Sequence, residues 1–516
     1  MTRAACAALL AAVLALGAPA RAAQPAIVLV PLDDRPVSLQ LPQLLGEIAG
    51  RPVAAPPRAL LGRYLRPGDP DAIIAWLNGE APHASDYVLS SDMLAYGGLV
   101  ASRVPGPSYV DAYDRLHALI RLRERFPRAN VDVFGTVMRL APTGIPDVGD
   151  AARFFAPYPQ WQYLQQYANL HDPLLPEEAE RARQLRASIG EPLLTAYLQT
   201  RARNYGVDHL LIELAGAGSI DRLVLGQDDA KTYGLHVPEL AALMAYAGER
   251  GGGRVSIEPG ADELAMALTA RALVRRAKLA PRVGVVYSTP GGEGYQDPLE
   301  FANAGTTIDR LIALCGGVRD DAHPDLVLAV RLPHTDAARN DAFLAVMRSS
   351  PRVALADLSF EESYAAQDAF ASELLRDGIA SRLDAYAGWN TAANTVGTAL
   401  GEAFAAAAGR ALRSYDANAH RTFTFMRFVD DVAYHDRVRP ALNDWLAANG
   451  VSDHTYLLPD VAARTAERNR ALLWYQAQAM LAQLYPGMHV AAMTIALPWD
   501  RTFETSLEVR IAPDLP

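Results

Sequence analysis

The stretch LVLGQDD, residues 223–229, is a short apolar run that ends in two adjacent carboxylates, Asp228 and Asp229. An apolar run of this length predicts a strand that is buried on both faces. Two acids placed side by side resist joint ionisation, so one of them is pushed toward the protonated form. A neutral acid beside an anion is what acid/base catalysis requires. The same pair is also typical of a helix N-terminus, where Asp caps free backbone N–H groups.

Similar apolar runs recur along the chain, and each is followed by a polar cluster and a helical pattern. These runs are 26–30, 87–90, 131–137, 223–226, 255–257, 283–286, 326–330 and 353–356. The amphipathic stretches between them include 109–125, 237–250, 262–275 and 337–348. Alternation of strands and helices predicts parallel βαβ units and an α/β fold. Eight candidate strands favour a (β/α)8 TIM-like barrel with a smaller, mainly helical C-terminal domain, and a doubly wound open sheet is the alternative.

The domain organisation follows from where this alternation holds. We assign residues 23–400 to the barrel as the catalytic domain, and residues 401–516 to a C-terminal α/β accessory domain. Residues 141–222, rich in Tyr, Gln, Glu and Arg, predict a helical insertion, and residues 383–390 would suit one more strand. In the C-terminal part helical patterns dominate until two candidate strands, at 490–497 and 505–511.

The N-terminus has the pattern of a secretory signal. Arg3 precedes the apolar stretch 7–17, and Ala-Arg-Ala at 20–22 resembles a cleavage site. We therefore expect residues 1–22 to be a signal peptide and the protein to be exported, either periplasmic or secreted. No later segment offers the roughly 20 uninterrupted apolar residues that a membrane-spanning helix needs.

Composition restricts the classes of partner. The chain has 48 basic and 58 acidic residues, a formal net charge of −10, and 50% of its residues are hydrophobic. An acidic globular protein is not expected to bind nucleic acid or an anionic membrane. Loss of Cys6 with the signal would leave Cys315 alone, so no intramolecular disulfide is expected.

Ionisable or aromatic residues follow nearly every predicted strand, at the barrel face where active sites of this fold lie. Together they predict a polar pocket with aromatic walls, which is typical of a sugar-binding site. Each residue also has a simpler interpretation, such as a local ion pair between Asp33 or Asp34 and Arg35, or a helix cap at Asp262. The candidate site residues are Asp33, Asp34, Arg35, Asp92, Tyr96, Arg139, Asp228, Asp229, Glu258, Tyr287, Arg331, Asp357, Trp389 and Asn390.

Other chemistries find less support in the sequence. No GxSxG or HExxH motif is present, and the His residues are scattered. A divalent metal held by Asp33, Asp92 and Asp228 would suit acidic ligands, but their spacing does not demand one. We therefore expect no cofactor and no metal.

Six strings resemble a bacterial family catalogued as domain-of-unknown-function family 4127. They are PLDDRPV (31–37), DMLAYGGLVASR (92–103), GQDDA (226–230), PGADE (259–263), AYAGWNTAANTVGTAL (385–400) and LPWDRTFE (497–504). The resemblance spans essentially the whole chain after the signal. The family name implies no mechanism.

The Asp-Asp pair also resembles that of substrate-assisted β-N-acetylhexosaminidases, in which the acetamido oxygen of the substrate attacks the anomeric carbon. The resemblance implies that Asp228 orients the acetamido group and that Asp229 is the general acid/base. Together with the predicted signal peptide, the resemblance implies an exported, retaining glycoside hydrolase that removes terminal GlcNAc or GalNAc.

The other candidate residues would then contact the sugar. Tyr96, Tyr287 or Trp389 would stack on the ring, and hydroxyl or acetamido contacts would come from Asp92, Arg139, Arg331 and Asn390.

Two alternatives stay open. One is a glycosidase that uses two separated carboxylates, Asp229 with Glu258 or Asp357. The other is a non-catalytic protein that binds carbohydrate or serves envelope assembly.

Overall fold

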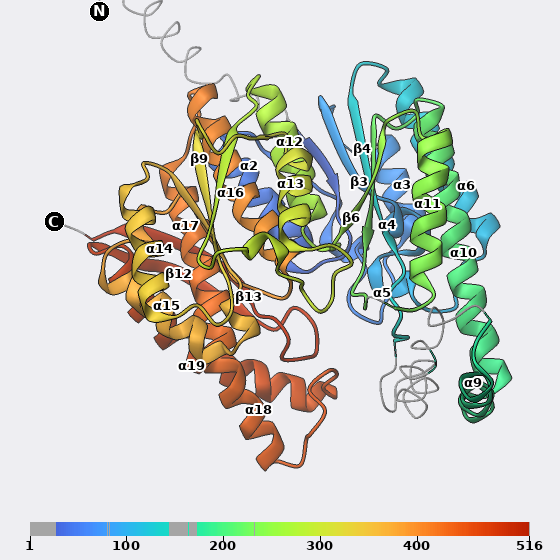
Figure 1. The fold of residues 1–516 in the computed structure, drawn as a ribbon. Helices are drawn as coiled ribbons and strands as arrows, with labels where there is room; N and C mark the ends of the chain where they lie inside the picture. Colours follow the sequence, from blue (N-terminus) through green and yellow to red (C-terminus); the bar gives the residue numbers. More distant parts are fainter. Residues whose placement is uncertain are drawn as a thin grey trace, which may run out of the picture.

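The computed structural model describes residues 27–143, 164 and 173–514, except for residues 80, 82 and 232. The expected signal peptide, residues 1–22, and most of the first half of the predicted insertion lie outside the described residues. Within the described part, the chain forms two parallel sheets surrounded by helices (Figure 1). The α/β class predicted from the sequence is confirmed.

The first sheet has six parallel strands in the order β2-β1-β3-β4-β5-β6. Its strands are β1 (Ile27–Val30), β2 (Val53–Ala54), β3 (Asp86–Ser90), β4 (Asn130–Val137), β5 (Arg222–Gln227) and β6 (Val255–Pro259). The second has five parallel strands in the order β11-β10-β9-β7-β8. They are β7 (Arg282–Tyr287), β8 (Val318–Arg319), β9 (Leu326–Arg331), β10 (Val353–Asp357) and β11 (Ala385–Ala387).

A single closed barrel was therefore the wrong prediction, although all eight strands on which it rested exist. Strand β7 pairs with β8 and β9 instead of continuing the first sheet beyond β6. Helices α12 (Leu264–Arg276) and α16 (Ala392–Leu412) pack against each other and are buried along nearly their whole length. Helices that are apolar on all sides need protein around them. The two helices lie between the sheets, where protein surrounds them on all sides, and they hold the two sheets apart.

The remaining helices pack against the sheets, against α12 and α16, or against one another. Those of the N-terminal half are α2 (Leu41–Ile48), α3 (Pro70–Gly79), α4 (Ser91–Tyr96), α5 (Leu99–Ser102), α6 (Tyr109–Arg125), α9 (Pro176–Ile189), α10 (Glu191–Gly216) and α11 (His236–Arg250). Those of the C-terminal half are α13 (Ala304–Leu314), α14 (Ala337–Ser349), α15 (Tyr364–Arg376), α17 (Ala417–Arg427), the π-helical η7 (Phe428–Val438), α18 (Arg439–Ala448) and α19 (Pro459–Leu484).

The first sheet separates two hydrophobic cores, because successive side chains of a strand point to opposite faces. Ile27 and Leu29 of β1 face the core that contains α12 and α16. Val28 and Val30 face a second core, which is completed by helices such as α6 and α10. Both faces of the sheet are therefore covered, which explains why its strands are continuous apolar runs.

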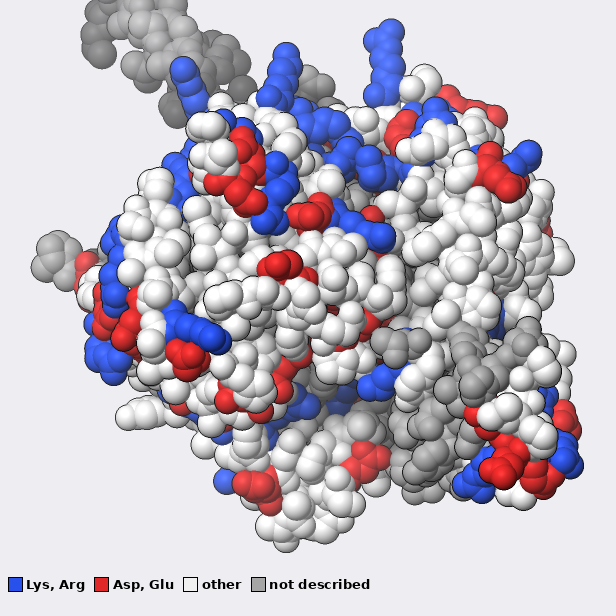
Figure 2. Space-filling view, viewed as in Figure 1, with Lys and Arg blue, Asp and Glu red and all other residues white. Residues whose placement is uncertain are grey.

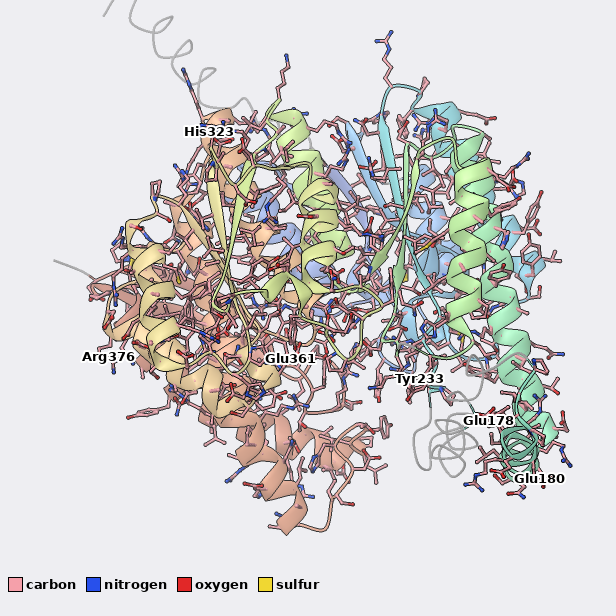
Figure 3. All side chains as sticks on the ribbon, in the orientation of Figure 1. Glu178, Glu180, Tyr233, His323, Glu361 and Arg376 are labelled. Carbon is pink, nitrogen blue, oxygen red and sulfur yellow. The ribbon has the colours of Figure 1, made fainter. Side chains whose placement is uncertain are left out.

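The predicted insertion is helical where it is described. Helix α9 carries Glu178 and Glu180 and projects from the body of the molecule (Figure 3), and α10 returns the chain to β5. No helix of the described part combines the length and apolar character needed to cross a membrane.

The C-terminal segment ends in an antiparallel hairpin of β12 (Met488–Ala496) and β13 (Ser506–Pro513), which packs on α19. The predicted boundary at residue 400 falls inside α16. The loop between the two hairpin strands, residues 497–505, returns toward the first sheet.

Strand β5 lies very close to the turn that follows β6. A Cβ added at Gly226 would lie only 2.3 Å from the carbonyl oxygen of Gly260. We expect Gly226→Ala to lower the free energy of unfolding by about 1–3 kcal/mol, as overpacking does. Gly248→Ala is the matched control: nothing lies within 4 Å of its added Cβ, and it should stabilise α11 by about 0.5–1 kcal/mol. Urea unfolding measures both. Wild-type stability for Gly226→Ala would contradict the close approach.

Candidate functional site

A cavity of about 690 Å³ opens at the carboxyl ends of β1, β4, β5 and β6. The loop after β11 and two C-terminal segments, residues 452–455 and 499–503, complete its walls. The charged and amide side chains that line it are Arg35, Arg103, Arg139, Gln227, Asp228, Asp229, Asp262, Glu300, Asn390, Asn394, Asp453 and Arg501. Ligand sites of open parallel sheets lie at this end of the strands.

Arg35 is the buried cation of this pocket. Its guanidinium donates to Asp33 at 2.7 and 2.9 Å and to Asp262 at 2.6 and 2.9 Å. Burial alone would raise the pKa of Asp262, but the charge and hydrogen bonds of Arg35 lower it overall. The ring of Trp499 packs against the guanidinium, 4.8 Å away. The turn after β1, the turn after β6 and the C-terminal segment therefore meet at one ion cluster.

Asp228 is fixed by a two-pronged ion pair. Arg103 donates from Nε at 2.8 Å and from Nη2 at 2.7 Å to the two carboxylate oxygens. The Asp228 side chain is 5% exposed and that of Arg103 is 9% exposed. Such a two-pronged, charge-assisted pair fixes the position of the carboxylate.

Asp229 has a different environment, although it is the next residue. Its side chain is 42% exposed in the pocket, and its closest charged partner is Arg139, at 3.8 Å. Desolvation by the pocket walls, and then the negative charge of Asp228, raise the pKa of Asp229. One carboxylate is therefore clamped, while its neighbour faces the cavity and holds a proton more readily.

Neither the Asp228–Asp229 pair nor Asp262 caps a helix. Helix α11 begins at His236, well beyond Asp229, and no side chain caps it. Helix α12 begins at Leu264, and the oxygens of Asp262 accept from Arg35 instead. The interpretation of these residues as caps was wrong, because ion pairs hold them elsewhere.

Three predicted residues of the first sheet lie outside the pocket walls. Asp92 is buried and accepts from Thr136 at 3.1 Å, and burial raises its pKa to about 7. Tyr96 is buried beneath the guanidinium of Arg203. Glu258 is also buried, and its pKa is raised by burial.

The turn after β1 contributes mainly to structure. Asp33 forms the predicted local ion pair with Arg35. Asp34 is buried and accepts from Trp499 Nε1 at 2.8 Å, with Arg58 at 3.4 Å. Of these residues only Arg35 lines the pocket.

Of the residues predicted from the second sheet, only Asn390 reaches the pocket. It adopts a φ of 59°, and its amide donates to Asn394 at 2.6 Å. Arg331 and Asp357 lie 3.8 Å apart in a buried cluster of their own. Tyr287 and Trp389 also lie outside the pocket lining. The pocket thus brings together five of the fourteen predicted residues: Arg35, Arg139, Asp228, Asp229 and Asn390.

Sequence reasoning missed several of the pocket residues. Arg103 ends the string 92–103 but lies 125 positions from its partner Asp228, so no spacing pattern could pair them. The aromatic residues that line the pocket are Tyr64, Trp499 and Phe503, not those predicted to stack on a sugar. The string LPWDRTFE (497–504), which contains Trp499 and Arg501, was the feature of the sequence that could have pointed to this wall of the pocket.

A metal site at Asp33, Asp92 and Asp228 is not assembled. Asp33 pairs with Arg35 and Asp228 with Arg103. Within the described residues, no three His, Cys, Asp or Glu side chains gather in an arrangement suited to a metal ion.

A comparison with protein families matches residues 27–508 to the family described as Protein of unknown function (DUF4127). The match covers most of the chain, so the chain belongs to this family, as the sequence strings indicated. No curated protein and no solved structure matches the chain. The likeness to hexosaminidases therefore rests on the Asp228–Asp229 pair.

The Arg35 cluster predicts a large loss of stability when its cation is removed. Arg35→Met leaves Asp33 and Asp262 as buried, unpaired charges, and should cost about 3–5 kcal/mol of unfolding free energy. The control Arg282→Met breaks an exposed pair with Asp325, which solvent screens, so the free energy of unfolding should stay close to that of the wild type. In the double variant Arg35→Met/Asp262→Asn, part of the loss should be recovered. An equal cost for both arginines in urea unfolding would show that the cluster is not stabilising.

Proposed function

We propose that this chain is an exported glycoside hydrolase in which Asp229 is the general acid/base. The observation that carries the proposal is the pair at the end of β5: Arg103 clamps Asp228, whereas Asp229 faces the cavity with a raised pKa. Carboxyl groups whose environments separate their protonation states are typical of acid/base sites. Export rests on the sequence of residues 1–22 alone.

The charges of the pocket favour a neutral, hydroxyl-rich ligand. Each pocket arginine has a carboxylate partner: Arg35 pairs with Asp262, Arg103 with Asp228, Arg139 with Asp229 and Arg501 with Glu504. A phosphate or another anion would have to compete with these carboxylates.

The N-terminus of α16 also favours a neutral ligand over an anion. Helix N-termini commonly bind anions. Here the backbone N–H groups of Ala392 and Ala393 donate to Asp297 at 2.7 Å and to Glu300 at 2.6 Å. The protein's own carboxyl groups occupy the positions that a phosphate would take. Acidic and basic side chains are also interspersed over the face shown in Figure 2.

The substrate class that fits the adjacent acids best is a terminal N-acetylhexosamine, GlcNAc or GalNAc. In the first step the acetamido oxygen bonds to the anomeric carbon as the glycosidic bond breaks, and Asp229 gives its proton to the leaving oxygen. Asp228 accepts the acetamido N–H as the ring nitrogen becomes cationic. In the second step water attacks the same carbon, the bond to the acetamido oxygen breaks, and Asp229 takes the proton, with net retention.

Two further pocket groups suit the acetamido function. Gln227 lines the cavity, and its buried Oε1 has no hydrogen-bond partner among the described residues. Asn390 holds Asn394 through its amide nitrogen. An unsatisfied buried acceptor in a pocket wall is costly until a ligand donor reaches it.

A second candidate mechanism uses Asp262 as a direct nucleophile. It is favoured by the opposite pKa directions of two pocket carboxyls, lowered at Asp262 and raised at Asp229. The partners expected from the sequence, Glu258 and Asp357, do not line the pocket, so this role would pass to Asp262. No cofactor enters either mechanism.

Hydrolysis of nitrophenyl glycosides by the purified protein tests the assignment of Asp229. Asp229→Asn should lower kcat/KM about 10²–10⁴-fold for a sugar with a poor leaving group, and less for an activated aryl glycoside. Asp228→Asn should impair both substrates, because the acetamido group loses its anion. Asp444→Asn, on exposed α18, is the matched control. If neither pocket variant alters hydrolysis, the pair is structural; glycan binding without released reducing sugar would indicate a binding protein.

Two inhibitors separate the mechanisms. A GlcNAc- or GalNAc-thiazoline mimics the cyclised intermediate and should bind at least about 10²-fold more tightly than substrate if the acetamido group attacks. An activated 2-deoxy-2-fluoro glycoside should instead label Asp262, detected by peptide mass spectrometry, if that residue attacks. Labelling of Asp262 without thiazoline inhibition would reject substrate assistance.

A further inference from the structure

We propose that the C-terminal wall of the pocket binds a second sugar unit, on the leaving-group side of the bond that is cleaved. This wall consists of Tyr64, Ser452, Asp453, Thr455 and Arg501. The natural substrate is then a glycan of at least two sugar units, not a glycoside of a small aglycone. The proposal rests on the glycosidase function proposed above.

The size of the cavity leaves room for this second unit. At about 690 Å³ it lies within the range of roughly 300–1,000 Å³ that is typical of pockets for drug-sized ligands. One pyranose ring at Asp229 would leave much of that volume unfilled. Residues 452–455 also line the cavity; they lie far along the chain from Asp229 and take no part in the proposed chemistry.

The wall is held in place before any ligand arrives. The Tyr64 hydroxyl donates to the Thr455 carbonyl at 2.5 Å, and its ring stacks on Trp499 with the ring centroids 4.9 Å apart. The Leu457 N–H donates to the Asp500 carbonyl at 2.6 Å, which joins the two C-terminal segments. Because the wall is already ordered, binding to it costs little conformational entropy.

Asp453 presents an acceptor atom from this wall. Its Oδ1 accepts from the Thr455 N–H at 2.8 Å and from the Thr455 hydroxyl at 2.6 Å. Its Oδ2 has no hydrogen-bond partner among the described residues. A carboxylate oxygen of this kind can accept from a sugar hydroxyl.

Arg501 presents a donor atom. Its Nε and Nη2 donate to Glu504 at 2.9 and 2.6 Å, and its guanidinium carbon lies 4.5 Å from the Trp499 ring centroid. No described residue accepts from Nη1. A fixed donor and a fixed acceptor suit a sugar hydroxyl, which can do both.

The wall and the reacting end belong to one site. Arg139 lies 3.8 Å from Asp229, and its charge also acts on the Tyr64 hydroxyl. Burial raises the pKa of that hydroxyl to about 12, and the charges of Arg501 and Arg139 oppose the rise. Asp229, Arg139, Tyr64 and Asp453 line the same cavity, so a glycan with one ring at Asp229 would extend past Arg139 toward Asp453.

The test compares two substrates with the same non-reducing sugar: its glycosyl fluoride, whose leaving group is one atom, and its disaccharide. Asp453→Asn keeps the acceptor for Thr455 and replaces Oδ2 with an N–H donor. It should lower kcat/KM for the disaccharide about tenfold or more and leave the fluoride within about twofold, because only the disaccharide reaches the wall. Ser452→Ala should act in the same direction. Asp444→Asn, in the same C-terminal segment but outside the pocket, should alter neither substrate.

The outcomes separate this proposal from the proposed function. Fluoride hydrolysis at wild-type rates together with a selective loss on the disaccharide supports the subsite. Equal effects on both substrates, or no effect on the disaccharide, overturn the subsite and leave the glycosidase intact. If the wild-type protein releases sugar from neither substrate nor from any nitrophenyl glycoside, the glycosidase itself is rejected and the subsite with it.

Discussion

The pocket depends on the neutralisation of one buried cation, the guanidinium of Arg35, which is 4% exposed. A buried charge is tolerated only with paired, hydrogen-bonded partners. Its two carboxylate partners, Asp33 and Asp262, come from the turns after β1 and β6, and Trp499 covers it from the C-terminal segment. One electrostatic requirement thereby fixes the relative positions of three chain segments. The acids at the end of β5 lie in the same cavity.

The separation of the two sheets sets the shape of that cavity. Because α12 and α16 are buried between them, the strands cannot close into a barrel, and the ends of the first sheet face loops from elsewhere in the chain. The loop after β11 brings Asn390, and the loop between β12 and β13 brings Arg501. The paired acids at the end of β5 and the other pocket residues thus come from distant parts of the sequence.

Local patterns predicted much of the secondary structure, because burial on both faces leaves continuous apolar runs. They located helix 109–125 and all eight runs that became strands. Polar side chains at strand ends include Asp228 and Asp229, which line the pocket. They also include Arg331 and Asp357, which do not line it, because these ends of the second sheet form a separate buried cluster. Polarity at a strand end does not indicate which other strand ends lie nearby.

The sequence by itself determined the α/β class, the family, and the adjacency of two acids after a buried strand, because these depend on neighbouring residues. Only the tertiary structure decided that the strands form two sheets, and that Arg103 clamps Asp228 while Asp229 stays open to the cavity. Strand pairing joins residues up to 90 positions apart, as between β4 and β5, and the ion pair of Arg103 with Asp228 spans 125 positions. Their outcome depends on which buried helices and charges must be covered, and no local pattern contains that information.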